Sequence, residues 1–505
     1  MKNKLLLLLL VVLIMPIGAW AALVVGDTFT TNGMTFKVTN LNPYEVQVGN
    51  NSTCVNKDTT GVITIPLKVM DSEWNVYVVK KIGDRAFSFC QNITKVDIPD
   101  SVTTIGDYAF YLCENLSNII IPNSITTIQK YAFYQCTSLS SIVIPNSVVE
   151  IGIGSFADTG LTSIYVDSGN PLFDSRNGCN AIIKTATNEL VIGCQSTKIP
   201  NTVKCIGKYA FYGCKTLTSI TIPNSVDSIC SGAFLGSGLT EISIPNSVNY
   251  IESGIFNGTP WYEGLPDGLI YKDNVLLGHK GVAVEADLVI TPGTRMIAAN
   301  AFSGLTVLTS VTIPENVTIC YRAFDSCVNL VSVTCGSDIG KEVFIHCDKL
   351  ENVTFLEGMT CIGDKAFYNV SSIKNITFPS TITSIGEYAF WKCTGLTSLS
   401  ITSGVTHWGI NVFRDCTGLT EVICSSNPGN NTFLNCTNLS KLTLGDGVTN
   451  VGDFAFQNCG LEDVSLPNTL NNIGKYAFSL CHELKNITIP SSVDSIGELA
   501  FEGCI

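Results

Sequence analysis

The amino-acid sequence predicts a repeat solenoid, in which β-rich coils stack so that their strands form a parallel sheet on one face. Three observations predict this fold. Phenylalanine recurs every 23 residues, first at Phe87, Phe110, Phe133 and Phe156. An alanine precedes most of these phenylalanines, and a short apolar strand lies between one phenylalanine and the next. A unit of this length cannot bury its own apolar face, so it must stack on its neighbours.

The parts of one unit have separate physical roles. Ser141–Ile144 alternates as a short strand does, with Ile142 and Ile144 expected to point inward. Pro145 ends the strand because proline has no backbone N–H for a ladder. An apolar pair, such as Val102 and Ile105, then begins the return arc, and an alanine followed by the phenylalanine fills the coil interior.

The repeat predicts about 17 coils over residues 81–505, preceded by a β-rich cap at residues 22–80 that covers the first coil. The seventeen repeat phenylalanines are Phe87, Phe110, Phe133, Phe156, Phe211, Phe234, Phe256, Phe302, Phe324, Phe344, Phe367, Phe390, Phe413, Phe433, Phe456, Phe478 and Phe501. At the other end the chain stops after Gly503-Cys504-Ile505 without a further strand. We therefore expect a C-terminal edge that is truncated or that associates with a partner, because an open edge invites association.

The recurring stretches Ile-Pro-Asn-Ser-Val, Ile-Gly-Asp-Tyr-Ala-Phe and Cys-Thr-Ser-Leu-Ser-Ser-Ile resemble the BspA-like leucine-rich-repeat family over residues 82–504. That family occurs in surface proteins of Bacteroidetes, spirochaetes and trichomonads. The resemblance implies a secreted or cell-surface protein that takes part in adhesion, coaggregation or binding of host matrix proteins such as fibronectin.

Residues 1–21 predict a secretory signal peptide. Lys2 and Lys4 precede the apolar run Leu5–Ile17, and Ala19-Trp20-Ala21 matches a small-x-small cleavage site. An uncleaved anchor is the alternative, because the apolar stretch continues to Val25. No later segment is long and apolar enough to span a bilayer, so we expect no membrane span in the mature chain.

Two gaps in the phenylalanine spacing predict insertions, near residues 165–200 and 258–290. The first contains a predicted hairpin, Ala181–Ile183 and Leu190–Ile192 about a Thr-Ala-Thr-Asn turn, and the second contains two short β-like runs. Such insertions are either binding elements or tolerated decoration. As binding elements, the insertions would supply aromatic anchors, and the candidate binding residues there are Phe173, Trp261, Tyr262 and Tyr271. Tyr165, the one aromatic residue at the outward strand positions of the open sheet face, is a further candidate.

Twelve of the 21 cysteines lie three residues after a repeat phenylalanine. Identical positions in stacked coils point their Cβ atoms in parallel, so we expect a ladder of buried thiols at these positions and not disulfides. Cys179 and Cys194 differ because they flank the first predicted hairpin symmetrically, which makes them the candidate disulfide pair.

Composition excludes several function classes. The net charge is −13 without basic clusters, which argues against nucleic acid as a partner. The four histidines, His279, His346, His407 and His482, lie in unrelated coils and are expected at surfaces or turns, so the sequence suggests no metal, cofactor or catalytic site. The sequence thus favours a non-enzymatic solenoid that binds an extracellular protein or glycan. The alternatives are a passive structural surface protein and, less favoured, a hydrolase on a solenoid scaffold.

Overall fold

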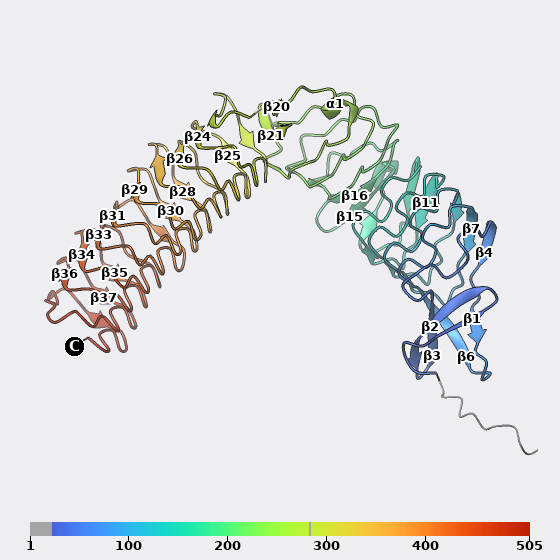
Figure 1. Cartoon of the computed structure of the whole chain (residues 1–505), viewed down its shortest axis with the longest axis horizontal. Helices are drawn as coiled ribbons and strands as arrows, with labels where there is room; N and C mark the ends of the chain where they lie inside the picture. Colours follow the sequence, from blue (N-terminus) through green and yellow to red (C-terminus); the bar gives the residue numbers. More distant parts are fainter. Residues whose placement is uncertain (1–22, 282–283, 505) are drawn as a thin grey trace, which may run out of the picture. The chain divides into compact units, whose positions relative to one another are not determined.

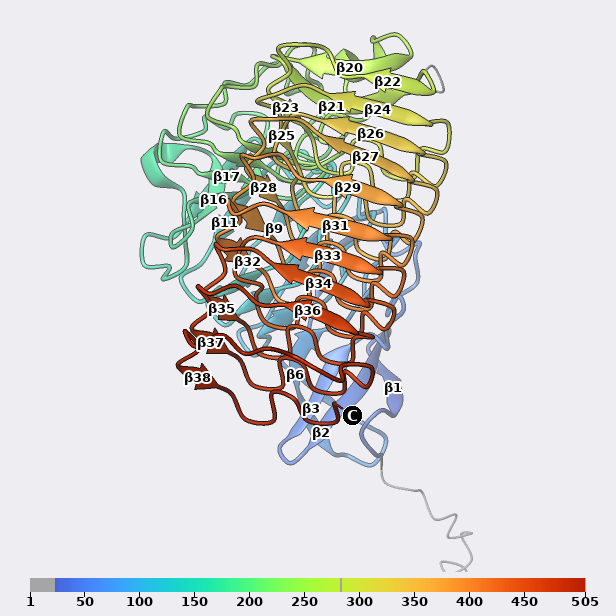
Figure 2. The ribbon, with the colours of Figure 1, turned by 90° about the vertical axis from the view of Figure 1, so that its left-hand side faces the viewer.

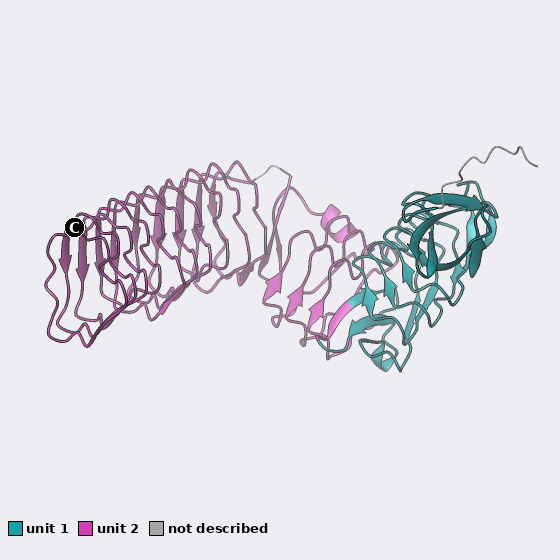
Figure 3. Ribbon diagram, turned by 90° about the horizontal axis from the view of Figure 1, so that it is seen from below, with its two compact units in different colours: residues 1–186, 191–197 teal, residues 187–190, 198–505 magenta. Residues whose placement is uncertain are grey.

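The structure is a computed structural model that describes residues 23–281 and 284–504. The predicted signal peptide at residues 1–21 lies outside this range. The chain divides into two compact units: unit 1 comprises residues 1–186 and 191–197, and unit 2 comprises residues 187–190 and 198–505 (Figure 3). The predicted fold is confirmed, because stacked coils with parallel strands and an N-terminal β cap make up the described residues (Figure 1).

Unit 1 begins with the cap, an antiparallel meander of β1, β2 and β3. β6 pairs in parallel with β3, and β5 pairs in antiparallel orientation with β6. The solenoid then carries two series of parallel strands, the longer one on the predicted sheet face and the other two residues long on the return arc. The elements are β1 (Thr28–Thr31), β2 (Met34–Leu41), β3 (Tyr44–Val48), β4 (Gly61–Thr64), β5 (Lys68–Met70), β6 (Val76–Ile82), β7 (Ile93–Asp97), β8 (Thr104–Ile105), β9 (Asn118–Ile119), β10 (Thr127–Ile128), β11 (Ser141–Ile144), β12 (Glu150–Ile151), β13 (Ser163–Val166), β14 (Phe173–Asp174), the 3₁₀ turn η1 (Arg176–Gly178) and β15 (Ala181–Lys184).

Unit 2 repeats the same two series, and its sheet-face strands follow one another in register (Figure 2). The strands β15 and β16 occur at the residues predicted for the first hairpin, and Glu189 and Leu190 of β16 belong to unit 2. Its elements are β16 (Glu189–Gly193), β17 (Cys205–Ile206), β18 (Ser228–Ile229), β19 (Tyr250–Ile251), α1 (Pro260–Glu263), β20 (Gly268–Lys272), β21 (Val275–Lys280), β22 (Asp287–Val289), β23 (Met296–Ile297), β24 (Ser310–Ile313), β25 (Thr318–Ile319), β26 (Ser332–Cys335), β27 (Asn352–Phe355), β28 (Cys361–Ile362), β29 (Asn375–Thr377), β30 (Ser384–Ile385), β31 (Ser398–Ile401), β32 (His407–Trp408), β33 (Glu421–Cys424), β34 (Lys441–Leu444), β35 (Asn450–Val451), β36 (Asp463–Ser465), β37 (Asn472–Ile473) and β38 (Ser495–Ile496).

The core is a column of stacked phenylalanine rings. Three runs of rings are stacked, from Phe87 to Phe156, from Phe211 to Phe256 and from Phe302 to Phe501, with neighbouring centroids 5.1 to 5.6 Å apart. The two insertions separate the runs. Strands such as β11 alternate between exposed and buried residues, with Ile142 and Ile144 inward as predicted.

Each repeat phenylalanine is flanked by two residues in the left-handed region, two positions before and two positions after it, in all seventeen coils. In the second coil these are Tyr108, with φ of 54°, and Leu112, with φ of 58°. This conformation lets the amides of Tyr108, Phe110 and Leu112 donate to three carbonyls of the next coil, at 3.1, 2.8 and 3.0 Å. The inter-coil hydrogen bonds offset the backbone cost of the left-handed conformation in a bulky residue, about 1–2 kcal/mol.

Candidate functional site

The second insertion interrupts the column of rings in unit 2. Phe256 stacks on Phe234, and it also contacts Trp261 in an edge-to-face arrangement, with ring centroids 5.3 Å apart and an interplanar angle of 76°. Phe302 resumes the column, and the ring that lies parallel to it is the imidazole of His279, at 6.2 Å. No ring of a repeat phenylalanine lies between Phe256 and Phe302 in the described residues. The interruption leaves a pocket beside the column.

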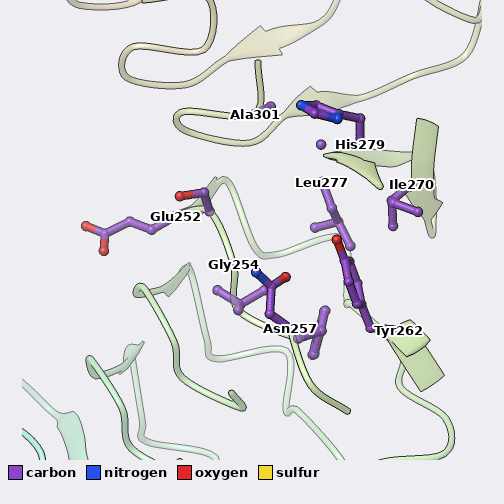
Figure 4. Close-up of a pocket in the computed structure, with 12 residues that line it drawn as sticks. Glu252, Gly254, Asn257, Tyr262, Ile270, Leu277, His279 and Ala301 are labelled. Carbon is purple, nitrogen blue, oxygen red and sulfur yellow. The ribbon is translucent and has the colours of Figure 1, made fainter. Parts of the chain in front are cut away.

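One wall of the pocket is the short helix α1. Thr259 caps the helix: its hydroxyl accepts a hydrogen bond from the Tyr262 amide at 3.1 Å and donates to the Phe256 carbonyl at 2.7 Å. Pro260 fits the first helical position, where its missing N–H costs nothing. The local sequence therefore places the Tyr262 ring directly beside the interrupted coil (Figure 4).

Lys280 fixes this wall to the hairpin of β20 and β21. Its ammonium donates to the carbonyls of Tyr262, Glu263 and Leu265 at 3.2, 2.8 and 3.0 Å, and it lies 5.5 Å from the centre of the Tyr262 ring. These carbonyls stand at and just beyond the C-terminal end of the helix, where a cation interacts favourably with the helix dipole.

The hairpin forms the second wall. β20 and β21 pair in antiparallel orientation with a register shift at Ile270 and Tyr271, and Val275 of β21 pairs in parallel with Met296 of β23. The hairpin approaches the next coil at Gly278, whose φ is 141° and where a Cβ atom would lie 3.1 Å from the Ala301 carbonyl oxygen. Only glycine fits this position without strain.

The pocket encloses a volume of about 150 Å³. Phe256, Ile270 and Leu277 are among the apolar residues that line the pocket, and Tyr262, Asn257 and His279 are among its polar residues. In Figure 4 the Glu252 side chain extends away from the other labelled side chains. Burial, followed by the nearby Glu263 carboxylate, raises the pKa of Tyr262, so its phenol stays a neutral hydrogen-bonding group at neutral pH. Glu252 accepts a hydrogen bond from the Ser231 amide at 2.7 Å, which orients its carboxylate. An apolar interior with a few fixed polar groups is typical of a binding pocket.

The predicted binding residues lie in different environments. Tyr262 lines the pocket, Trp261 packs on Phe256, and the Tyr271 hydroxyl accepts from the Thr291 amide at 3.3 Å. In unit 1, Phe173 is only 4% exposed, whereas Tyr165 is 53% exposed. The structure thus brings Trp261 and Tyr262 together on α1.

Sequence reasoning missed most of the pocket lining. His279, Glu252, Asn257, Ile270 and Leu277 were not singled out as binding residues, and His279 was expected at a surface or turn. The signal that locates them is the irregular spacing between Phe256 and Phe302, because a missing ring must leave either a void or a substitute.

A second candidate surface lies on the open sheet face of unit 1. Ile120 and Val143 are 70% and 55% exposed, and Val143 pairs with Tyr165 across β11 and β13. A groove of about 470 Å³ runs along Ile120 and Val143. Serine, asparagine and isoleucine make up most of the remaining lining residues.

The two thiols of the candidate disulfide pair contact different carbonyl groups. The Cys179 thiol lies 3.9 Å from the Ala181 carbonyl oxygen, and the Cys194 thiol donates to the Asn180 carbonyl at 3.4 Å. Both are free thiols in this structure. Their pairing under oxidising conditions stays a prediction.

The ladder cysteines follow one pattern. Ten of them donate their thiol to the carbonyl oxygen of the repeat phenylalanine in an earlier coil, at 3.1 to 3.3 Å: Cys113, Cys136, Cys327, Cys347, Cys393, Cys416, Cys436, Cys459, Cys481 and Cys504. Burial raises the pKa of Cys327 and Cys481 to about 12. These thiols are structural groups of the core.

The histidines do not converge on a common site. The Nδ1 atom of His346 lies 3.0 Å from Asp325, that of His407 2.9 Å from Thr406, and that of His482 2.9 Å from the Gly503 carbonyl. Within the described residues, no group of three or more histidine, cysteine or acidic side chains could hold a metal ion. No helix among those residues has the length and apolar character needed to cross a bilayer.

Comparison with known proteins places these features in a family. Solved structures similar to this chain include a leucine-rich repeat protein from Bacteroides ovatus (25% identity, 94% of this chain and 92% of that one, TM-score 0.35). A leucine rich cell surface protein from Faecalibacterium prausnitzii (24%, 78% and 94%, 0.30) and the pneumococcal vaccine antigen PcpA (17%, 94% and 94%, 0.30) are also similar. No curated protein matches the chain significantly. The model of the BspA type leucine rich repeat region matches residues 75–176, 188–262, 286–339, 337–429 and 427–505, so this chain belongs to the BspA-type leucine-rich-repeat family.

Proposed function

We propose that this protein is an extracellular or cell-surface recognition solenoid, and that the pocket at the interrupted ring column receives one apolar side chain of a protein partner. The observation that carries the proposal is the pocket itself, which stands where the repeat is broken by an insertion. A cavity of about this volume admits a group the size of benzene. The occupant we infer is therefore a leucine or phenylalanine side chain, with the surrounding polar groups contacting its backbone.

Three further observations support an extracellular recognition role. Residues 1–21 have the pattern of a signal peptide, members of the family are often surface proteins, and one similar solved structure is described as a cell surface protein. The family is also typically non-enzymatic. A buried pocket for one anchor, framed by polar groups, is how protein interfaces concentrate their binding energy.

The test fills the pocket without changing the hairpin that forms it. Leu277→Trp places a large ring in the cavity, and Leu269→Trp on the same hairpin is the matched control because Leu269 is not among the lining residues. Binding to immobilised fibronectin, laminin and collagen would be measured by surface plasmon resonance. We expect Leu277→Trp to weaken binding by at least about tenfold, roughly 1.4 kcal/mol, and the control to leave it unchanged. Equal binding by all three chains, or none by the unmodified chain, would overturn the proposal.

A passive structural role is the second candidate. The outward positions of β24, β26 and β27 carry serine, threonine and asparagine, which offer few anchors for tight binding. Absence of binding by the unmodified chain to every matrix protein would favour this alternative.

A further inference from the structure

The thiols of Cys205 and Cys230 hydrogen-bond to each other, and both side chains are only half-buried. Cys205 begins β17, and Cys230 follows β18 in the next coil, two residues beyond the Ser228 that pairs with Cys205. Their sulfur atoms lie 3.6 Å apart and share a hydrogen bond in which either thiol can be the donor. The two sulfurs are therefore already in van der Waals contact.

The ladder cysteines show why this contact is unusual. In the ladder, ten of the twelve thiols donate to a phenylalanine carbonyl, as Cys416 does to Phe390 at 3.1 Å, so these sulfurs are engaged with the backbone. Cys416 is also fully buried, whereas Cys205 and Cys230 are half-buried and can meet a reagent from solvent. Cys205 and Cys230 therefore combine a sulfur–sulfur contact with access from solvent.

The two thiols also differ in acidity. The hydrogen bond with Cys230 lowers the pKa of Cys205 below its usual value, and the same hydrogen bond raises the pKa of Cys230. Of the two, Cys205 is thus the better source of thiolate, the form that attacks a disulfide.

We propose that Cys205 and Cys230 form a reversible disulfide that joins two adjacent coils, by exchange with a low-molecular-weight disulfide such as oxidised glutathione. The Cys205 thiolate attacks one sulfur of the reagent, forms a mixed disulfide and releases one thiolate. Cys230 gives its proton to solvent and attacks the Cys205 sulfur, which releases the second thiolate. Two protein thiols are oxidised, and one reagent disulfide is reduced to two thiols.

The bond requires only a small movement. A disulfide holds its sulfurs about 2.05 Å apart, so the sulfur atoms of these two half-buried side chains must approach by about 1.5 Å. The link would lie next to the pocket, because Ser231 follows Cys230 and donates its amide to Glu252 at 2.7 Å. This inference does not depend on the pocket having a partner.

The experiment is peptide mapping of the whole chain after incubation with oxidised glutathione and blocking of free thiols with N-ethylmaleimide. Trypsin places the two cysteines in the fragments Cys205–Lys208 and Thr216–Lys272. We expect these fragments to be joined, to separate on reduction, and to be joined again after re-oxidation. The buried ladder cysteines should map as unlinked thiols.

Two variants make the result specific. Cys205→Ser should abolish the joined fragments, whereas Cys361→Ser, at the matching strand position of another coil, should leave them intact. Full blocking of both Cys205 and Cys230 by N-ethylmaleimide after oxidation would overturn the proposal. Linkage of Cys205 or Cys230 to some other cysteine would overturn it as well.

Discussion

Two stretches of unit 2 pack the aromatic rings of their core differently. From Phe302 to Phe501 the rings of successive coils lie 5.1 to 5.4 Å apart and within 12° of parallel. Between Phe256 and Phe302, a tryptophan edge and an imidazole replace the missing ring, and a pocket remains. The rings of a uniform stack fill the coil interior, whereas a cavity remains beside the column where the stack is broken.

The two stretches also differ at the position three residues after the phenylalanine. The regular stretch places a cysteine there in most coils, with its thiol on a phenylalanine carbonyl. The coil at the interruption has Thr259, whose hydroxyl donates to the Phe256 carbonyl and also caps α1. The hydroxyl can do both because it accepts hydrogen bonds more strongly than a thiol does.

The largest expected difference between the stretches is in their response to alkaline pH. The pKa of Cys481 is raised to about 12 by burial, so the unfolded thiol, with its ordinary value near 8.5, loses its proton first. The unfolded state then binds fewer protons, and the free energy of unfolding falls as pH rises from about 9 towards 12. Each buried thiol contributes a loss of up to about 1.4 kcal/mol per pH unit, and below about pH 8.5 this stability is fully present.

The measurement compares urea unfolding of the unmodified chain and Cys481→Ala at about pH 7.5 and about pH 10.5. At the lower pH the variant should be less stable, by about 1 kcal/mol, because it lacks the buried sulfur. At the higher pH this difference in unfolding free energy should vanish or change sign. Thr259→Ala is the control because it keeps every ionisable thiol. Its unfolding free energy should therefore change with pH as that of the unmodified chain does. A constant difference for Cys481→Ala would contradict the prediction.

A second comparison removes one ring from each stretch. Phe367 is stacked on both sides, by Phe344 and Phe390, so Phe367→Ala should cost about 3–5 kcal/mol of unfolding free energy. Phe256 is stacked on one side and borders the pocket on the other, and Phe256→Ala should cost about 3 kcal/mol or less. Urea titration of both variants, followed by far-UV circular dichroism, gives the two losses. Equal losses would mean that the interrupted coil is packed as tightly as the regular ones.

The sequence contained enough information to predict the stack and the places of the two insertions, but not the pocket beside the second one. The phenylalanine period and the alternation of Ser141–Ile144 arise from burial, and burial repeats with the coil. The sequence indicates the return arc but not its series of strands, because each of these strands, such as β10, is only two residues long. The positions with left-handed backbone conformation could not be predicted, because residues such as tyrosine and leucine occupy many of them in place of glycine, as at Tyr108 and Leu112.

The pocket was harder to predict because its residues follow no period. Glu252 and Asn257 belong to the last coil before the insertion, and Ile270, Leu277 and His279 belong to the hairpin. Their meeting depends on the register shift at Ile270 and on the close approach at Gly278. The same applies to Cys205 and Cys230, whose contact is diagonal between coils and not at matching positions.

The smallest expected effect concerns the left-handed positions themselves. At the interruption, the two positions that flank Phe256 are Gly254 and Gly258, which adopt positive φ without strain, whereas Leu480 in the regular stretch has φ of 59°. Asparagine tolerates this region better than leucine, and in the coil before, Asn458 donates its amide to Asn435 at 3.0 Å. Leu480→Asn should therefore raise the free energy of unfolding by about 0.5–1 kcal/mol and extend that row of amides. The reciprocal Asn458→Leu should lower it by a similar amount in the same urea titration. A loss of stability in Leu480→Asn would show that the contacts of the leucine side chain outweigh its backbone strain.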